Sequence, residues 1–273
     1  MGLSAQKLAF GVFRPKGLQA LMVAAAQSFL GRGKIKKALS FLSMLKPNQP
    51  FDIDYYGIKL RLYPLDNTIE NKILFSNRQR EQMEINAIKA HMNPQGVFVD
   101  IGANIGYYSL MAAKLGYQKI IAFEPSQIVL ERFAENIRLN GFQNAITVYQ
   151  CCVGEIKGRA DMVITDHDLG GSSAAKPDLA GSKLQVDQVA LKDVMIDEDI
   201  ERIDCIKIDV EGLEDRILFS YFADCLKQCY PRMIIIEDNS TKGWQKNILH
   251  WLLKNGYQTK AITRSNHILL YAN

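Results

Sequence analysis

The sequence predicts an α/β fold in which a mostly parallel, doubly wound sheet carries helices on both faces. Short apolar runs alternate with helical segments from residue 97 onward, which is typical of parallel strands joined by crossover helices. A bend rich in glycine follows the first of these runs. The chain has 273 residues, of which 48% are hydrophobic and 23% charged, and these values fit one large domain with an appendage.

The first elements lie ahead of this alternating pattern. Residues 1–46 indicate one or two helices, which end before Pro47 and Pro50. Residues 51–63 indicate a hairpin around a glycine. Residues 70–92 indicate one helix, and its expected inward positions are Ile73, Met83, Ile88 and Met92.

The rest of the chain supplies the strands and helices of the sheet. We expect strands at 97–101, 119–123, 145–152, 203–210 and 233–237, helices at 107–115, 127–140 and 243–255, and a closing strand pair at 258–263 and 267–271. Residues 165–183 are rich in Gly, Ser and Pro and predict a mobile loop. We therefore divide the chain into a basic helical N-terminal extension, residues 1–50, and one domain, residues 51–273.

Charge is unevenly distributed along the chain. Residues 1–50 contain eight Lys or Arg and no Asp or Glu, whereas the remainder contains 25 basic and 29 acidic residues. A basic head on a slightly acidic body predicts contact with an anionic surface, and a solvated helical extension is the alternative. The apolar run 18–30 is shorter than the ~20 residues that span a bilayer, so the predicted mode is peripheral membrane contact through residues 1–46.

The five cysteines are scattered and form no CxxC pair, which is typical of reduced thiols. Together with the lack of a cleavage site after the apolar run, this predicts a cytoplasmic protein that can lie at a membrane surface.

The segment VFVDIGANIGYYSL, residues 97–110, carries the strongest chemical signal. A strand that ends near Asp100 runs into a loop with Gly102 and Gly106, and a helix follows. Such a loop places a polar ligand at the carboxyl end of a strand, beside a helix N-terminus. The spacing D-x-G-x-x-x-G differs from the G-x-G-x-x-G of dinucleotide binders, which argues against an NAD-dependent oxidoreductase.

A second signal follows on the next strand. The run KIIAFEP ends in Glu124, 24 residues after Asp100. A carboxylate at the end of the second strand can accept both ribose hydroxyls of an adenosine group, although a solvent-facing acid is the alternative. The two signals together predict a nucleoside-binding site.

These segments, with ENIRLNG, CCVGEIKG and IDCIKIDVEGLEDRIL, resemble the FkbM-type family of S-adenosylmethionine-dependent methyltransferases over roughly residues 55–273. The resemblance implies a Rossmann-like class I methyltransferase fold with a mostly parallel seven-stranded sheet. It also implies S-adenosyl-L-methionine as cofactor and O-methylation of a hydroxyl on a sugar, glycan or natural product. A non-catalytic nucleoside-binding protein that retains the fold is the alternative.

The resemblance also implies which residues hold the cofactor. The loop 100–107 would hold its methionine and ribose parts, Glu124 its ribose, and the residues after the third strand its adenine, while Asp209 and Glu211 would face the methyl-transfer centre. The full set of implied cofactor contacts is Glu81, Asp100, Gly102, Ala103, Asn104, Gly106, Tyr107, Glu124, Pro125, Ser126, Cys152, Val153 and Asp209.

Methylation of an alcohol requires a group that accepts its proton. Asp209 is a candidate base, and Lys207, two residues earlier on the same strand face, either assists it or is only its charge partner. His167, in the predicted loop, is a second candidate base or a solvated side chain.

A metal ion is the other way to prepare the acceptor. Asp209, Glu237 and Asp238 follow neighbouring strands and could hold Mg²⁺ through their oxygens, or Glu237 contacts the substrate without a metal. We expect no nucleic-acid partner, because the chain contains neither a [DNS]-P-P-[YFW] tetrapeptide nor interleaved aromatic residues for base stacking.

Overall fold

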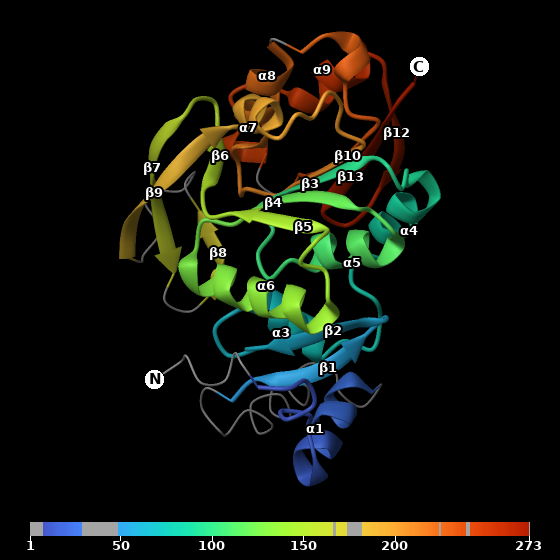
Figure 1. Ribbon diagram of the computed structural model, residues 1–273, viewed down its shortest axis with the longest axis vertical. Coiled ribbons are helices and arrows are strands. Elements are labelled where there is room, and N and C mark those ends of the chain that lie inside the picture. The colour runs from blue at the N-terminus through green and yellow to red at the C-terminus, as the bar shows by residue number, and fades with distance from the viewer. Residues whose placement is uncertain are drawn as a thin grey trace.

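The computed structural model describes residues 8–28, 49–165, 168–173, 182–223, 225–238 and 241–272. A seven-stranded sheet in the order β12-β13-β11-β10-β3-β4-β5 forms the centre of the molecule (Figure 1). Its strands are β3 (Val97–Ile101), β4 (Lys119–Phe123), β5 (Ile146–Tyr149), β10 (Cys205–Ile208), β11 (Met233–Glu237), β12 (Tyr257–Ile262) and β13 (Asn266–Tyr271). Only β13 runs against its neighbours in this sheet, so the predicted mostly parallel seven-stranded fold is confirmed.

Helices cover both faces of this sheet. On one face lie α4 (Gln82–His91), α5 (Tyr107–Leu115) and α6 (Gln127–Asn140), and on the other α7 (Leu191–Asp197), α8 (Glu214–Ala223) and α9 (Ile248–Lys254) (Figure 1). Successive strand residues point to opposite faces, so Phe98 packs in the core beneath α5 and α6 while Val99 packs in the core beneath α8 and α9. Packing in the two cores holds the carboxyl ends of the strands, where the candidate site lies, in position.

The hairpin that the sequence predicts is present and lies on the outer side of α6 (Figure 1). Its strands β1 (Phe51–Tyr55) and β2 (Ile58–Leu62) pair antiparallel through Tyr56 and Gly57, which both have positive φ, as in a tight two-residue hairpin turn. The side-chain oxygen of Asn136 on α6 accepts a 2.8 Å hydrogen bond from the backbone N–H of Arg61 on β2. The hairpin is therefore joined directly to the helix layer.

The predicted helix over 70–92 is two helices, α3 (Thr68–Leu74) and α4. The break lies at residues 75–81, where Glu81 adopts a left-handed conformation with φ of 51°. Ile73 and Ile88 are buried as expected, and Met92 is half-buried. The expected inward position of Met83 is wrong: it is 53% exposed, because the break resets the helical phase.

A second sheet of four strands takes up the part of the predicted loop that the structure describes. It contains β6 (Cys152–Gly154), β7 (Gly158–Thr165), β8 (Asp168–Ser173) and β9 (Ser182–Ala190), in the order β6-β9-β7-β8. The predicted strand over 145–152 is consequently divided, because β5 ends at Tyr149 and β6 belongs to the second sheet. The predicted helix over 243–255 is shorter, because the 3-10 turn η2 (Thr241–Gly243) precedes α9; another 3-10 turn, η1 (Lys227–Cys229), precedes β11.

The described part of the N-terminal extension holds one helix, α1 (Gly17–Gln27), which packs near α3. The remainder of the helical region expected over residues 1–46 lies outside the described residues. Within the described ranges, no helix combines the length and apolar character that crossing a bilayer requires.

Candidate functional site

A cavity of about 200 Å³ lies at the carboxyl ends of β3, β4, β10 and β11. It connects the loops that follow these strands with α3 and with the second sheet. Eight residues predicted for the cofactor or metal line it: Gly102, Asn104, Glu124, Pro125, Cys152, Val153, Asp209 and Glu237. A smaller hollow of about 30 Å³ adjoins it through shared wall residues and adds Glu81, Asp100, Ala103, Tyr107 and Lys207. The structure thus brings most of the predicted site residues together.

Close packing against the loop after β10 requires glycine at position 102. Gly102 has a φ of 79°, and a Cβ atom there would lie 2.0 Å from the carbonyl oxygen of Asp209. The backbone after β3 therefore touches the backbone after β10 directly. A side chain at this position would push the two loops apart and deform the floor that the two cavities share.

Gly106 and Ser126 line neither cavity among those described. Gly106 precedes α5 with a φ of 81°, and a Cβ atom there would lie 1.8 Å from the ring of Phe133 on α6. The need for glycine at this position is explained by helix packing. Ser126 contributes its backbone N–H, which donates a 2.8 Å hydrogen bond to Oε1 of Glu124.

Glu124 has the environment expected of a ribose-binding carboxylate. It directly follows β4 and is 8% exposed. Its Oε2 accepts a 2.9 Å hydrogen bond from the backbone N–H of Asn104, and its Oε1 the one from Ser126. Each oxygen retains acceptor capacity for a ligand hydroxyl. Burial raises the pKa of Glu124 to about 7, against the two backbone hydrogen bonds, which lower it.

Asp100, on β3, is hydrogen-bonded to the first turn of α5, across the loop that joins these two elements. Its Oδ2 accepts hydrogen bonds from the backbone N–H and the hydroxyl of Ser109, at 3.0 and 2.6 Å. It thereby satisfies a free amide in the first turn of α5. Burial raises the pKa of Asp100 to about 6, while hydrogen bonds from Ser109 and the charge of Lys207 lower it.

The part of the cavity predicted for adenine is apolar. Phe123, Cys151, Cys152, Val153 and Met162 line it, and Phe123 stacks on Tyr149 at a centroid distance of 5.5 Å. Burial raises the pKa of the Cys152 thiol to about 11, so the thiol stays neutral and serves as a small polarisable contact. Sequence reasoning does not select Met162, on β7, because its segment precedes the predicted loop, although the run MVIT is rich in residues that favour strands.

Lys207 and Asp209 form the predicted pair on one strand face. Lys207 is buried, and its Nζ lies 3.6 Å from Oδ2 of Asp209 and 5.3 Å from the centroid of the Tyr108 ring. Nζ also donates a 3.3 Å hydrogen bond to the carbonyl of Ile208. The ammonium group therefore partly neutralises Asp209 and holds it at the cavity wall.

Three carboxylates converge at the cavity. Asp209, Glu211 and Glu237 each offer an oxygen, and these atoms lie within 4.8 Å of one another. Asp238, the third predicted metal ligand, is placed elsewhere: its Oδ2 lies 2.9 Å from Nε2 of His267. The candidate base His167 lies outside the described residues.

A buried carboxylate shapes the loop that carries Glu211. Oε1 of Glu214 accepts hydrogen bonds from the backbone N–H groups of Val210 and Gly212, at 3.0 and 3.1 Å. Its Oε2 accepts a 2.7 Å hydrogen bond from the indole of Trp244. The role of Glu214 cannot be read from the sequence, because its partners are backbone amides and a side chain 30 residues away.

Another part of the cavity wall consists of residues that the sequence alone does not single out. Thr68, Ile69 and Lys72 of α3 and Leu169 of β8 line it. Arg80 also lines it and forms a 2.5 Å ion pair with Glu81. This wall mixes apolar and cationic side chains.

Comparison with known proteins identifies the family. The model of the methyltransferase FkbM domain matches residues 100–259. Methyltransferase sdnD of Sordaria araneosa is 29% identical over 160 residues, which cover 47% of this chain and 61% of that protein. A ribosomal protein L11 methyltransferase of Listeria innocua is 38% identical over 69 residues, which cover 25% of this chain and 22% of that protein. The chain thus spans less than two thirds of the length of these curated relatives.

Solved structures are more distant. The METTL16 MTase domain is 13% identical, covers 97% of this chain and 99% of its own, and superposes with a TM-score of 0.49. M. capricolum TrmK in complex with S-adenosyl-homocysteine is 14% identical, with 68% and 66% coverage and a TM-score of 0.40. We base the fold assignment on the strand order and on the family match, which covers more than half of the chain. The chain belongs to the methyltransferase FkbM domain family.

Proposed function

We propose that the protein transfers the methyl group of S-adenosylmethionine to a hydroxyl oxygen of a small-molecule or glycan acceptor. The family implies this cofactor, which supplies an electrophilic methyl group on a sulfonium centre when bound. The enzyme's task is then to hold the acceptor oxygen in line with the methyl carbon and to accept its proton.

The residues present fit the cofactor. Glu124 would accept the ribose hydroxyls, and the loop 102–104 would lie against the ribose and methionine parts. The apolar wall of Cys152, Val153 and Met162 would contact the adenine. A buried carboxylate beside a glycine bend at the end of adjacent parallel strands supports a nucleoside ligand.

The convergence of Asp209, Glu211 and Glu237 at the cavity is the observation that supports a hydroxyl acceptor. Carboxylates accept hydrogen bonds, so this wall fits a molecule that presents several O–H donors, as a sugar does. Asp209 would take the proton from the reacting hydroxyl, and Lys207 would keep its carboxylate in place. The apolar and cationic wall of α3 would contact the remainder of the acceptor.

Mg²⁺ at the acidic cluster stays a prediction and is not part of the proposal. The three carboxylate oxygens are of the type that a hard cation prefers. If the ion takes part, EDTA removes methyl transfer and added Mg²⁺ restores it. Transfer that persists in EDTA leaves Asp209 to accept the proton unaided.

Isotope-labelled cofactor provides the test. The full chain is incubated with fractionated cell extract and S-adenosylmethionine that carries a deuterated methyl group, and mass spectrometry searches for labelled metabolites and glycans. We expect label on an oxygen of a polyhydroxylated product. Label only on nitrogen or carbon contradicts O-methylation. Tight cofactor binding without any labelled product across the fractions favours the non-catalytic nucleoside-binding protein.

A further inference from the structure

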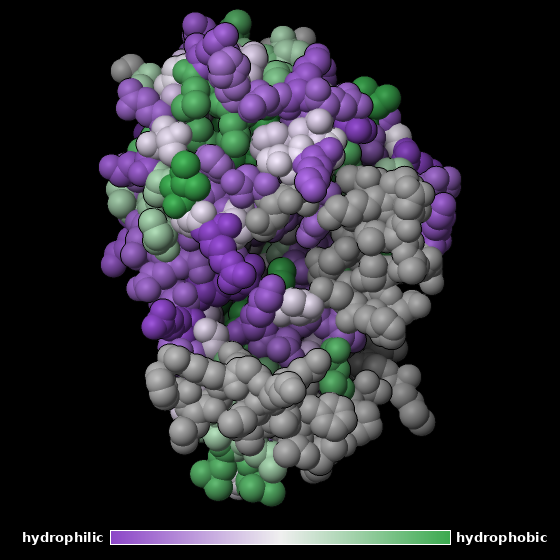
Figure 2. Space-filling model, turned by 180° about the vertical axis from the view of Figure 1, so that it is seen from behind, coloured by the Kyte–Doolittle hydropathy of each residue, from purple (hydrophilic) through white to green (hydrophobic). Residues whose placement is uncertain are grey.

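An apolar surface is exposed at the N-terminal end of the described structure. Leu18 and Leu21, three residues apart on α1, are 67% and 68% exposed, and Leu8 and Val12 in the preceding segment are exposed as well. Figure 2 shows hydrophobic side chains gathered at the end of the molecule where Figure 1 places α1. Side chains at i and i+3 share one face of a helix, so the two leucines form one surface. We name Leu18 and Leu21 the N-terminal apolar face.

The opposite side of α1 packs against the protein. Val23 and Ala26 are buried in the main core. The side-chain amide of Gln27 donates a 2.6 Å hydrogen bond to the carbonyl of Leu74 at the end of α3. The helix is therefore attached by one side, and the other side presents leucines to the surroundings.

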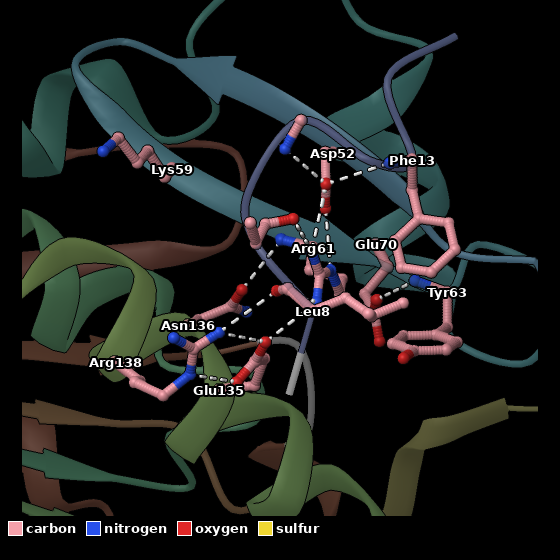
Figure 3. A network of polar contacts seen from close by, with 12 residues as sticks. Leu8, Phe13, Asp52, Lys59, Arg61, Tyr63, Glu70, Glu135, Asn136 and Arg138 are labelled. Carbon is pink, nitrogen blue, oxygen red and sulfur yellow. Dashed lines mark hydrogen bonds and ion pairs between the residues drawn. The ribbon is translucent and has the colours of Figure 1, made fainter. Parts of the chain in front are cut away.

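A buried charge network holds the segment ahead of α1 on the hairpin (Figure 3). The Arg61 guanidinium is fully buried and pairs with both oxygens of Asp52, at 2.8 and 3.0 Å, and with Glu135 on α6 at 2.9 Å. It also donates hydrogen bonds to the carbonyls of Leu8 and Ala9, at 3.1 and 3.0 Å.

Asp52 completes the attachment by accepting hydrogen bonds from the backbone N–H groups of Gly11 and Phe13, at 2.7 and 3.2 Å. The ring of Phe13 lies 4.8 Å from the Arg61 guanidinium. Charge-assisted bonds of this kind are strong when water is excluded. The N-terminal apolar face is thus held in a defined position rather than left on a free tail.

The segment that carries this face is basic in sequence. Residues 8–28 contain Arg14 and Lys16 and no acidic residue, and the first fifty residues contain eight bases and no acid. Arg14 forms an ion pair with Asp54 and is still half exposed, and Lys16 directly precedes α1. A second copy of this face would bring like charges together. Anionic lipid headgroups supply the opposite charge, and their acyl region accepts the leucines.

We propose that the N-terminal apolar face docks the protein on a bilayer that carries anionic headgroups. Other strongly exposed apolar residues, such as Ile156 between β6 and β7 and Ile196 on α7, lie on separate segments of the chain and do not form such a pair on one helix. The proposal does not depend on the methyl acceptor, because it concerns where the protein lies.

Flotation with vesicles tests the proposal on the full chain. Vesicles of phosphatidylcholine alone are compared with vesicles of phosphatidylcholine and phosphatidylglycerol, at low and high salt. We expect wild-type protein to float with the anionic vesicles and to be released by salt. Leu18→Glu with Leu21→Glu should lower the bound fraction about tenfold, because it replaces apolar insertion with repulsion from the headgroups. Ile196→Glu, at a 76% exposed position on α7, is the matched control and should float as wild type does.

Thermal melting and cofactor affinity check that the double variant is folded. The proposal is overturned if wild-type protein stays with the soluble fraction, or if the double variant floats undiminished. It is also overturned if light scattering shows a wild-type dimer that the double variant abolishes while flotation is unchanged, since the face would then be an interface between copies. If the wild-type protein floats with anionic vesicles but transfers no methyl group, only the proposed function is contradicted.

Discussion

The side-chain amide of Asn67 donates a 3.0 Å hydrogen bond to the side-chain oxygen of Asn104. Asn67 caps α3, because its own side-chain oxygen accepts from the N–H groups of Ile69 and Glu70 at 2.9 and 3.1 Å. The backbone of Asn104 in turn donates to Glu124. One chain of hydrogen bonds therefore links α3, which is proposed to contact the methyl acceptor, to Glu124, the carboxylate expected to hold the ribose.

Replacing Asn67 with Asp should weaken cofactor binding while α3 stays capped. The carboxylate keeps the two cap bonds but turns the donor that faces Asn104 into an acceptor. Loss of such a buried hydrogen bond costs about 1 to 2 kcal/mol, or roughly tenfold in the Kd of S-adenosylmethionine by calorimetry. Asn67→Ala loses both functions and should also lower the melting temperature further. An unchanged Kd in Asn67→Asp would show that the cap of α3 does not influence the cofactor site at Asn104 and Glu124.

Gly102→Ala should abolish cofactor binding. The added Cβ would meet the carbonyl oxygen of Asp209 at 2.0 Å, and the left-handed backbone adds about 1 kcal/mol of strain. Gly141→Ala is the matched control, because Gly141 is also left-handed, with φ of 73°, and has open space around it. The control should lose a little stability and keep its affinity. Normal affinity in Gly102→Ala would contradict the assignment of this loop.

Asp209→Asn should lower turnover about 10² to 10⁴-fold and change cofactor affinity little, since the amide fills the same space but cannot take a proton. Transfer of labelled methyl into the active extract fraction measures the first effect, and calorimetry the second. Asp187→Asn, at an exposed acid on β9, controls for surface charge and should leave both values unchanged. Equal activity in Asp209→Asn would exclude it as the proton acceptor.

The raised pKa of Glu124 predicts two pH effects. Cofactor affinity should fall as the pH drops below about 7, because the protonated carboxyl loses one of its acceptor positions for the ribose hydroxyls. Stability without ligand should change in the opposite sense. A carboxyl whose folded pKa lies above its unfolded value binds more protons when folded, so this contribution declines as the pH rises from about 4.5 to about 7.

Glu124→Gln separates this residue from the other buried acids. The variant should flatten the dependence of the melting temperature on pH between 5 and 7.5, a range chosen around the folded pKa of about 7. It should also bind S-adenosylmethionine with a weak, nearly constant affinity over this range. Parallel pH profiles of wild type and variant would mean that Glu124 is ionised throughout.

Local signals explain what the sequence could predict. The bounds of β3, β4, α5 and α6 match the expected ranges, because apolar runs, glycines and helix periodicity lie within each segment. Gly102 and Glu124 were found for the same reason, since both follow an apolar strand directly. The second sheet was missed because β8, DLGGSS, has few residues that favour strands and pairs with β7 through tertiary contacts.

The alternation of side chains along a strand explains which acids join the cluster of Asp209, Glu211 and Glu237. Glu237 and Asp238 are neighbours at the end of one strand, so their side chains point to opposite sides. Glu237 joins Asp209, whereas Asp238 pairs with His267. The contribution of Glu211 depends on the loop that Glu214 organises, and its left-handed φ of 59° could not be read from residue types.

The wall formed by α3 and β8 has a consequence for redesign. The backbone N–H of Leu169 on β8 donates a 2.8 Å hydrogen bond to the carbonyl of Asp66, just ahead of α3. These two elements lie outside the seven-stranded sheet, whereas Gly102 and Glu124 belong to its loops. Exchanging both segments together between homologous enzymes, with Asn67 kept, should therefore retarget such a catalyst to a new molecule without rebuilding its nucleoside pocket.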